Sequence, residues 1–190
     1  MKPRFIVLLL ALAAVTVATI YRAANPHRRE AVDPAMQNSQ PAPGFQLLDQ
    51  NNRPVQLRGY LGRHRVLVAF FDGRTGPLAD QVLLKLKEYQ PALKAEGVMI
   101  LAISTPLAPD IKPQALSFPF PVLRDTNAGS PESCSRIWGV CSEPASAGKS
   151  AVVMPALFLV DRRGQVAWLG DHPQPFEDPE GAIASILRGE

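Results

Sequence analysis

A continuous apolar run constrains the fold of this chain more than any other feature. Every residue from Val66 to Phe71 is apolar, and the run comes directly after Arg65. A strand with one face in water alternates apolar and polar residues, whereas a strand covered on both faces is apolar throughout. We therefore expect residues 65–71 to form a central strand of a sheet that has other layers packed against both of its faces.

Further elements are indicated before and after this strand. Apolar residues recur at helical spacing over 78–93, and Gly97 ends that predicted helix. A short helix is expected to open at Ser130-Pro131, with serine at the cap and proline at the first position, and to run to about Trp138. Strands are expected at 45–48, 55–57, 98–104, 118–123, 155–160 and 165–169, and a last helix from 178 or 179 to 187.

The order of these elements predicts the fold class. A strand, a helix and a strand are followed by a hairpin and a terminal helix, which is a three-layer α/β plan with a mixed central sheet. The runs at 45–48 and 55–57 flank Asp49-Gln50-Asn51-Asn52, which is a turn signal. They therefore predict an N-terminal hairpin that extends the three-layer plan.

The first 41 residues differ in composition from the rest. Residues 5–20 are largely apolar and follow a basic start. Their length is close to the roughly 17–25 residues that span a bilayer. We expect residues 1–22 to be an uncleaved membrane anchor, with a cleaved signal segment as the alternative. Residues 23–41 are rich in Pro, Asn, Gln, Ala and charge, which predicts a flexible linker, and the folded domain is then 42–190.

The distribution of charge limits the expected partners. The formal net charge is +3, and Lys2, Arg4 and Arg22 account for all of it, because the other 17 basic residues match the 17 acidic ones. The basic excess therefore belongs to the N-terminus and gives no reason to expect nucleic-acid binding. The expected partner is the membrane, through the N-terminal segment. The default orientation of such an anchor places the domain on the periplasmic or extracytoplasmic side of the cytoplasmic membrane.

Several sequence segments from residue 41 onward carry a family resemblance through their order and spacing. They are Ala42-Pro43-Gly44-Phe45-x-Leu47, Val55-x-Leu57-x-Gly59-Tyr60-x-Gly62, the strand at 65–71, Val98-x-Ile100-x-x-Ile103-Ser104, Ile137-Trp138-Gly139-Val140 and Pro155-x-x-Phe158-Leu159-Val160-Asp161-x-x-Gly164. In this order they resemble the redoxin branch of the thioredoxin-like superfamily, which includes peroxiredoxins and membrane-anchored thioredoxin-like proteins. The resemblance implies a thioredoxin-like fold and an oxidoreductase or antioxidant activity. It also matches Pro155 to the superfamily's cis-proline, which faces the active-site loop.

The chain departs from these relatives where their chemistry takes place. The superfamily usually carries aromatic-Cys-Gly-Pro-Cys after the central strand, whereas here Gly76-Pro77 stands between Thr75 and Leu78. In the peroxiredoxin register, Thr75 matches the threonine of Thr-x-x-Cys and Leu78 replaces the peroxide-reducing cysteine. In the thioredoxin alignment and in the peroxiredoxin alignment alike, Leu78 stands where a cysteine is expected. A thiolate is the nucleophile in this chemistry. The usual active site is therefore predicted to be degenerate.

Supporting groups of the family's site are missing as well. By the resemblance, Ala69 stands where thioredoxin has a buried acid, and Met154 or Pro155 stands where peroxiredoxins have an arginine. A threonine nucleophile needs an adjacent base, and Asp72 is the one candidate near Thr75 in sequence. We expect Thr75 to cap the helix that follows it instead.

Cys134 and Cys141 are the remaining sulfur ligands or nucleophiles. Cys134 is expected in the first turns of the short helix, where the helix dipole favours a thiolate, and Cys141 where the chain leaves it. Outside the cytoplasm we expect a structural disulfide between them. Two reduced packing cysteines and a relocated redox pair are the alternatives. His172 could join them as a metal ligand, but the spacing matches no familiar site, so neither a metal nor a cofactor is expected.

Together these residues predict a membrane-tethered, redoxin-like domain that binds a protein or peptide without catalysis. The expected binding groove is formed by Arg74, Gly76, Pro77 and Pro155. Two alternatives remain open. One is a thiol-disulfide oxidoreductase that uses Cys134 and Cys141, and the other is a metallochaperone-like binder.

Overall fold

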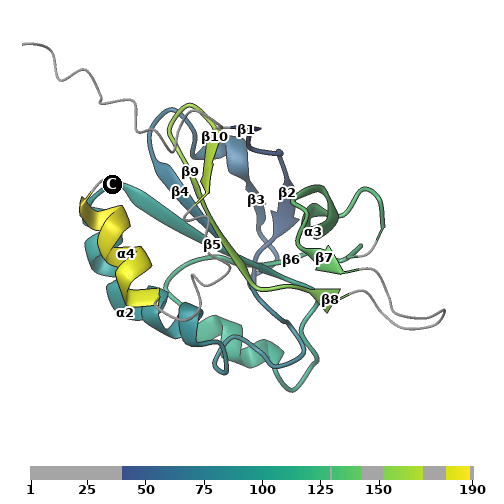
Figure 1. The fold of residues 1–190 in the computed structure, drawn as a ribbon. Helices are drawn as coiled ribbons and strands as arrows, with labels where there is room; N and C mark the ends of the chain where they lie inside the picture. The colour runs from purple at the N-terminus through teal and green to yellow at the C-terminus, as the bar shows by residue number, and fades with distance from the viewer. Residues whose placement is uncertain (1–39, 129, 143–151, 169–178, 189–190) are drawn as a thin grey trace, which may run out of the picture. The chain divides into compact units, whose positions relative to one another are not determined.

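The predicted central strand is β4 (Arg65–Phe70), which lies inside an eight-stranded mixed sheet (Figure 1). The computed structural model describes residues 40–128, 130–142, 152–168 and 179–188. In spatial order the sheet is β1 (Gln40–Pro41), β10 (Gln165–Trp168), β9 (Ala156–Val160), β4, β5 (Val98–Ser104), β6 (Val122–Arg124), β2 (Gln46–Leu48) and β3 (Pro54–Gln56). β4 pairs in parallel with β5 and antiparallel with β9, so the expected mixed central sheet is confirmed.

Helices cover the sheet, and a second, two-stranded sheet lies beside it. They are α2 (Gln81–Ala95), α3 (Cys134–Ile137), α4 (Pro179–Arg188) and the 3-10 helices η2 (Leu57–Gly59) and η3 (Lys112–Ser117). The small sheet pairs β7 (Cys141–Ser142) with β8 (Val152–Val153) in antiparallel register. The expected N-terminal hairpin is present as β2 and β3, which pair antiparallel with Leu47 opposite Val55.

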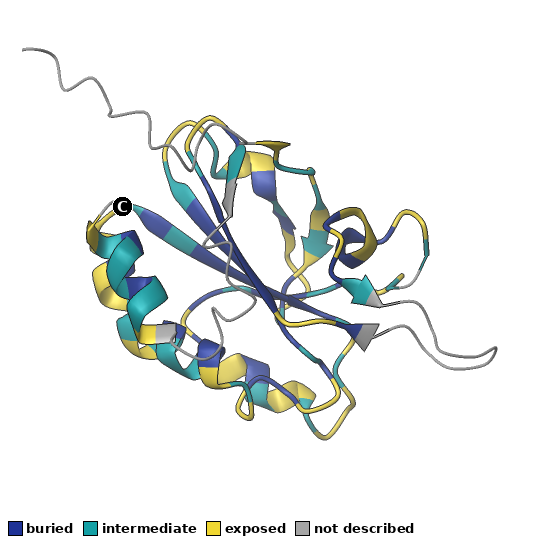
Figure 2. Ribbon diagram, viewed as in Figure 1, coloured by how far each residue is buried: buried dark blue, intermediate teal, exposed yellow. Residues whose placement is uncertain are grey.

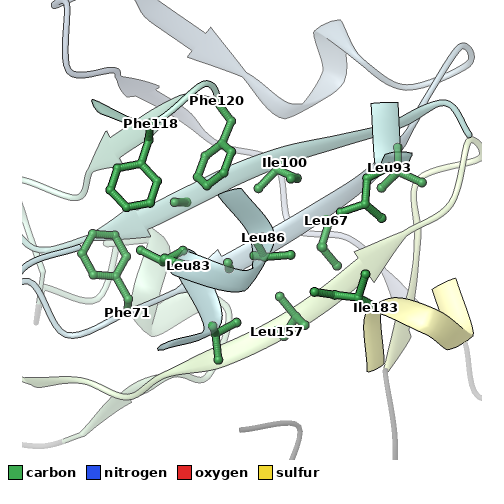
Figure 3. Close-up of a cluster of buried hydrophobic side chains, with 14 of the residues drawn as sticks. Leu67, Phe71, Leu83, Leu86, Leu93, Ile100, Phe118, Phe120, Leu157 and Ile183 are labelled. Atoms are coloured by element: carbon green, nitrogen blue, oxygen red, sulfur yellow. The ribbon is translucent and has the colours of Figure 1, made fainter. Parts of the chain in front are cut away.

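Alternate residues of β4 supply two separate hydrophobic clusters, one on each face of the sheet. Leu67, at an odd-numbered position, packs under α2 and α4, where Leu83, Leu86 and Ile183 cover it (Figure 3). Even-numbered positions such as Val68 face the other way, into a cluster that contains Trp138. Figure 2 shows β4 buried through most of its length. Successive side chains of β4 point to opposite faces of the sheet, and all of them are apolar after Arg65. The strand therefore packs against a layer on each face, as expected from the sequence.

The second cluster is built around the indole of Trp138. Its ring centroid lies 5.0 Å from that of Phe158, 5.8 Å from that of Phe70 and 6.3 Å from that of Phe45. Tilted and edge-to-face aromatic pairs of this kind stabilise by about 0.5–1.5 kcal/mol each beyond the area they bury. The cluster joins β4, β9 and the N-terminal segment to the residue that ends α3.

Two helices begin later than the sequence predicts. The cap of α2 is Asp80, whose carboxylate accepts a hydrogen bond from the Leu83 N–H at 2.9 Å, so the helix starts three residues after Leu78. The cap of α3 is Ser133, whose hydroxyl accepts from the Arg136 N–H at 3.3 Å, and not Ser130. In both cases a turn precedes the cap and occupies residues that were assigned to the helix.

The strand expected at 118–123 is also shorter and later, as Val122–Arg124. Two prolines at 119 and 121 have no N–H to donate to a neighbouring strand, which delays the pairing. η3 lies directly before them in the chain. The β9–β10 hairpin, by contrast, has the expected turn, with Gly164 at φ +80°.

The folded domain includes residues before 42. Gln40 and Pro41, assigned to the linker, form β1 and pair with β10 opposite Val166 and Gln165. The predicted anchor 1–22 and linker residues 23–39 lie outside the described residues, as does residue 178 before α4. Within the described part of the chain, no helix combines the length and apolar character needed to cross a bilayer.

Candidate functional site

Asp72 organises the loop between β4 and α2. Its carboxylate accepts hydrogen bonds from the Arg74 main-chain N–H at 3.0 Å and from the guanidinium, with Nη2 at 2.6 Å. Its carbonyl accepts from the N–H of Thr75 at 3.3 Å and from the Thr75 hydroxyl at 3.0 Å. The hydrogen bond from the Arg74 side chain lowers the pKa of Asp72. These contacts fold residues 72–75 into a closed turn.

Thr75 is exposed, and its hydroxyl serves this turn. The proton of the hydroxyl points to a main-chain carbonyl, which cannot accept it as a general base. Thr75 also does not cap α2, as the sequence predicted, because Asp80 does. The structure therefore gives Thr75 a local conformational role.

Gly76 and Pro77 are buried against η3. Gly76 has a φ of +83°, in the left-handed region that favours glycine. A Cβ atom at this position would lie 2.5 Å from Cγ2 of Ile111 and 2.9 Å from Oε1 of Gln114. The glycine of the family motif is thus required here by backbone conformation and close packing.

Leu78 lies in a turn outside α2, with 42% of its surface exposed. It was expected in the first turn of that helix, where main-chain N–H groups and the helix dipole would stabilise a negative charge. The helix instead begins at Gln81, and the Asp80 carboxylate already lies at its N-terminus. The position of the missing cysteine therefore holds an exposed apolar side chain.

The segment before β9 forms the other side of the expected groove. Ala156 pairs with Phe70, which places Met154 and Pro155 at the edge of the sheet where β4 ends. Both are exposed, Met154 to 46%. The described residues contain no cis peptide bond, so the bond before Pro155 is trans, in contrast to the resemblance. The Met154 N–H donates to the Val140 carbonyl at 2.7 Å, so this backbone edge already has a partner.

The expected groove residues are therefore divided in their accessibility. Arg74 and Pro155 are exposed and can contact a partner. Gly76 and Pro77 are buried, because they pack beneath the loop surface. The exposed side chains of the loop after β4 and of the segment before β9 include Arg74, Leu78, Met154 and Pro155.

Cys134 is a free thiol with 6% of its surface exposed. Burial raises the pKa of this thiol strongly, and the negative charge of Asp125 raises it further. The Asp125 carboxylate accepts from the N–H and the hydroxyl of Ser135, at 2.8 and 2.7 Å. The thiolate predicted from the helix dipole is thus opposed, because α3 is a single turn and desolvation is the dominant effect.

The disulfide expected between the two cysteines is not formed in the structure, since Cys134 is free. Cys141 begins β7 and is half-buried, and β7 is held by its pairing with β8. His172, the remaining member of the metal-site alternative, lies outside the described residues. Within the described ranges, no group of three or more His, Cys, Asp or Glu side chains is placed to hold a metal ion.

Residues 39–169 match the AhpC/TSA family. The chain belongs to the AhpC/TSA family. Its curated relatives include alkyl hydroperoxide reductase E of Mycobacterium tuberculosis and of Mycobacterium bovis, each 33% identical over 138 residues. That alignment covers 72% of this AhpC/TSA chain and 85% of the relative. The resemblance to the redoxin branch is thereby confirmed.

Solved structures support the same fold for this AhpC/TSA chain. Peroxidoxin BcpB from Mycobacterium tuberculosis has a TM-score of 0.63 at 19% identity, and covers 80% of this chain and 96% of its own. Peroxiredoxin Q from Xanthomonas campestris has a TM-score of 0.60 at 20% identity, with 76% and 90% covered. A putative thiol:disulfide interchange protein DsbE from Chlorobium tepidum has a TM-score of 0.55 at 25% identity, with 78% and 96% covered.

Proposed function

We propose that this AhpC/TSA domain binds a polypeptide at its degenerate site and carries out no thiol chemistry there. The observation that carries the proposal is Leu78, an exposed leucine at the position that the family resemblance assigns to the peroxide-reducing cysteine. An isobutyl group cannot ionise or attack a peroxide. Thr75 offers no substitute, because its hydroxyl has no base to take its proton.

The names of the relatives favour a peroxidase or a thiol-disulfide oxidoreductase, and both reactions need an accessible thiolate. In this chain the alternative nucleophiles are Cys134 and Cys141, and Cys134 is buried in the aromatic cluster with a raised pKa. At neutral pH such a sulfur remains a protonated thiol out of reach of substrate. The physical setting of Cys134 therefore argues against a relocated redox centre.

The proposed contact surface is apolar and lies at one edge of the sheet. Leu78 follows β4, and Met154 and Pro155 precede β9, the antiparallel neighbour of β4. Because the Met154 N–H already bonds to Val140, the partner does not gain affinity by adding a strand to this N–H. Recognition therefore depends on apolar side chains of the partner that pack on Leu78 and Met154. We also infer that residues 1–22 tether this domain to the cytoplasmic membrane on its periplasmic side.

The catalytic half of the proposal is tested by peroxide consumption. The full chain is mixed with hydrogen peroxide or cumene hydroperoxide and with dithiothreitol as the reductant. We expect the same rate as with dithiothreitol alone, for the wild type and for Cys134→Ser. Peroxide turnover by the wild type that disappears in Cys134→Ser would overturn the degenerate-site proposal and favour a relocated centre.

The binding half is tested by photo-crosslinking from a single position. A photoreactive amino acid replaces Leu78 or, as a matched control, Leu48 of β2, which is also a partly exposed leucine at 38%. We expect a discrete crosslinked polypeptide from position 78 in the native membrane fraction, absent from position 48 and competed by excess wild-type protein. Equal products from both positions, or none from 78, contradict binding at this surface.

A further inference from the structure

Basic side chains gather at one end of the sheet, although residues 42–190 as a whole contain equal numbers of basic and acidic residues. Four segments bring basic side chains to the end of the sheet where β4 and β5 begin, opposite the degenerate site. We call this the basic end, and it consists of Arg63, Arg65, Lys94, Arg162, Arg163 and Arg188. In Figure 1 the start of β4 and the β9–β10 turn lie at the upper end of the sheet, and α4 ends to the left of them.

Several contacts hold the basic end together. The Arg65 N–H donates to the Gly97 carbonyl at 3.1 Å, and the Arg162 carbonyl accepts from the Gly62 N–H at 2.8 Å. The Arg65 guanidinium donates to the Ile186 carbonyl at 3.3 Å, near the end of α4. The basic end is therefore built from the turn before β4, the end of α2, the β9–β10 turn and the last turn of α4.

Acidic residues are fewer than basic ones among the described residues of these segments. Glu96 and Asp161 are the acidic residues, whereas Arg63, Lys94 and Arg162 are basic and exposed. The Asp161 carboxylate is already used within its turn, where it accepts from the N–H groups of Arg163 and Gln165. Burial lowers the pKa of Arg65, the charge of Arg162 lowers it further, and the charge of Glu96 raises it in part, so the net shift is downward.

The chain enters the folded domain at this same end. Gln40 and Pro41 pair with β10 next to the β9–β10 turn, and the Ala42 N–H donates to the Gly164 carbonyl at 2.8 Å. The 39 preceding residues contain the apolar segment 5–20. If that segment enters the membrane, as proposed above, its tether holds the basic end at high effective concentration beside the bilayer.

We propose that the basic end lies against anionic phospholipid headgroups of the membrane that residues 1–22 enter. This inference rests on the proposed anchor, and it adds an orientation to the domain. Arginine and lysine side chains are attracted to an anionic leaflet within about a Debye length, roughly 8 Å at physiological salt. The point where the tether begins favours the bilayer over a soluble polyanion, because the membrane is the surface that the tether keeps close.

The orientation is tested with the full chain reconstituted into vesicles. A fluorescent amino acid replaces Ala95, which is exposed beside Lys94, or Leu116, which is exposed on η3. The vesicles are phosphatidylcholine with or without phosphatidylglycerol, and contain a lipid with a spin-labelled headgroup as the quencher. We expect phosphatidylglycerol to increase quenching at position 95 and not at 116, and salt to remove the increase.

Charge variants decide whether the basic end is responsible. Arg63→Gln/Arg162→Gln is expected to return quenching at position 95 to its level in phosphatidylcholine alone, with an unchanged circular dichroism spectrum. Lys112→Gln, which removes an exposed cation from η3, should keep the full increase. Three results of the quenching experiment would overturn the proposal: no increase with phosphatidylglycerol, an increase that the double variant retains, or equal increases at positions 95 and 116. A full chain that does not float with the vesicles would also overturn it. None of these readouts depends on peroxide turnover or on crosslinking at Leu78.

Discussion

Comparing Gly76→Ala with Gly62→Ala separates the energetic cost of backbone conformation from the cost of steric overlap. Gly62 has the same φ of +83°, but an added Cβ there meets no atom within 4 Å. At both positions alanine must adopt the left-handed region, which costs roughly 1–2 kcal/mol for a residue with a Cβ. At Gly76 the new methyl group also lies 2.5 Å from Cγ2 of Ile111, which is far inside contact distance.

The expected magnitudes follow from these two terms. Overpacking of a well-filled site costs about 1–3 kcal/mol, so Gly76→Ala should destabilise by roughly 2–5 kcal/mol and Gly62→Ala by roughly 1–2 kcal/mol. Urea unfolding of residues 38–190, which form one contact unit, is followed by tryptophan fluorescence. With a slope of about 2 kcal/mol per molar urea, the two midpoints should differ by about 0.5–1.5 M.

A third variant shows whether Ile111 is the obstacle. Ile111→Ala removes the atom that the new methyl group meets, so its own cost should shrink in the Gly76→Ala background. Equal midpoints for Gly76→Ala and Gly62→Ala, or an Ile111→Ala cost that does not change between backgrounds, would refute the packing argument. The loop would then be held by its backbone conformation alone.

Three further predictions concern other parts of the domain. Cys134 should resist alkylation in the native protein at neutral pH and react in urea, as read by mass spectrometry; rapid native labelling would contradict its burial and raised pKa. Asp72→Asn should lower the urea midpoint at pH 7. The pKa of Asp72 is lower in the folded state than its ordinary value of 3.8, so its ionised carboxylate stabilises the fold above that pH. The difference in midpoint between variant and wild type should therefore shrink as the pH falls below 3.8 through the folded-state pKa. A gap that stays constant with pH would exclude the Asp72–Arg74 contact as its cause. A chain that begins at Gly44 should unfold at lower urea than one that begins at Asn38, because it lacks β1; equal midpoints would show that β1 contributes nothing.

The sheet could be predicted from the sequence because the residue pattern of each strand indicates which of its faces are buried. An apolar run such as 65–71 shows burial on both faces without reference to any distant segment. The start of α2 was misplaced because Leu78 continues the apolar spacing of the helix, although Asp80 is a residue type that favours the cap position. Asp80, a residue type that favours the cap, lies within the apolar pattern and was the signal that could have placed the start of α2 correctly.

The properties of the candidate site depend on contacts that local sequence does not contain. Gly76 is constrained by Ile111, which lies far along the chain, directly before η3. The raised pKa of Cys134 depends on Asp125 and on burial in a cluster that includes Phe45 and Phe158. Only the fold brings these residues together, so a helix-dipole argument from the sequence around Cys134 predicted the opposite direction of the shift.

Because Cys134 is buried, the rate at which it is oxidised depends on how often the structure around it opens. An oxidant can reach this sulfur only when the cluster around Trp138 separates, so the rate of oxidation follows the population of the opened state. Oxidation to an acid would then place a second negative charge beside Asp125, and the damaged chain could not close again in the same packing. The fraction of oxidised Cys134 therefore measures how often the structure has opened in the presence of an oxidant.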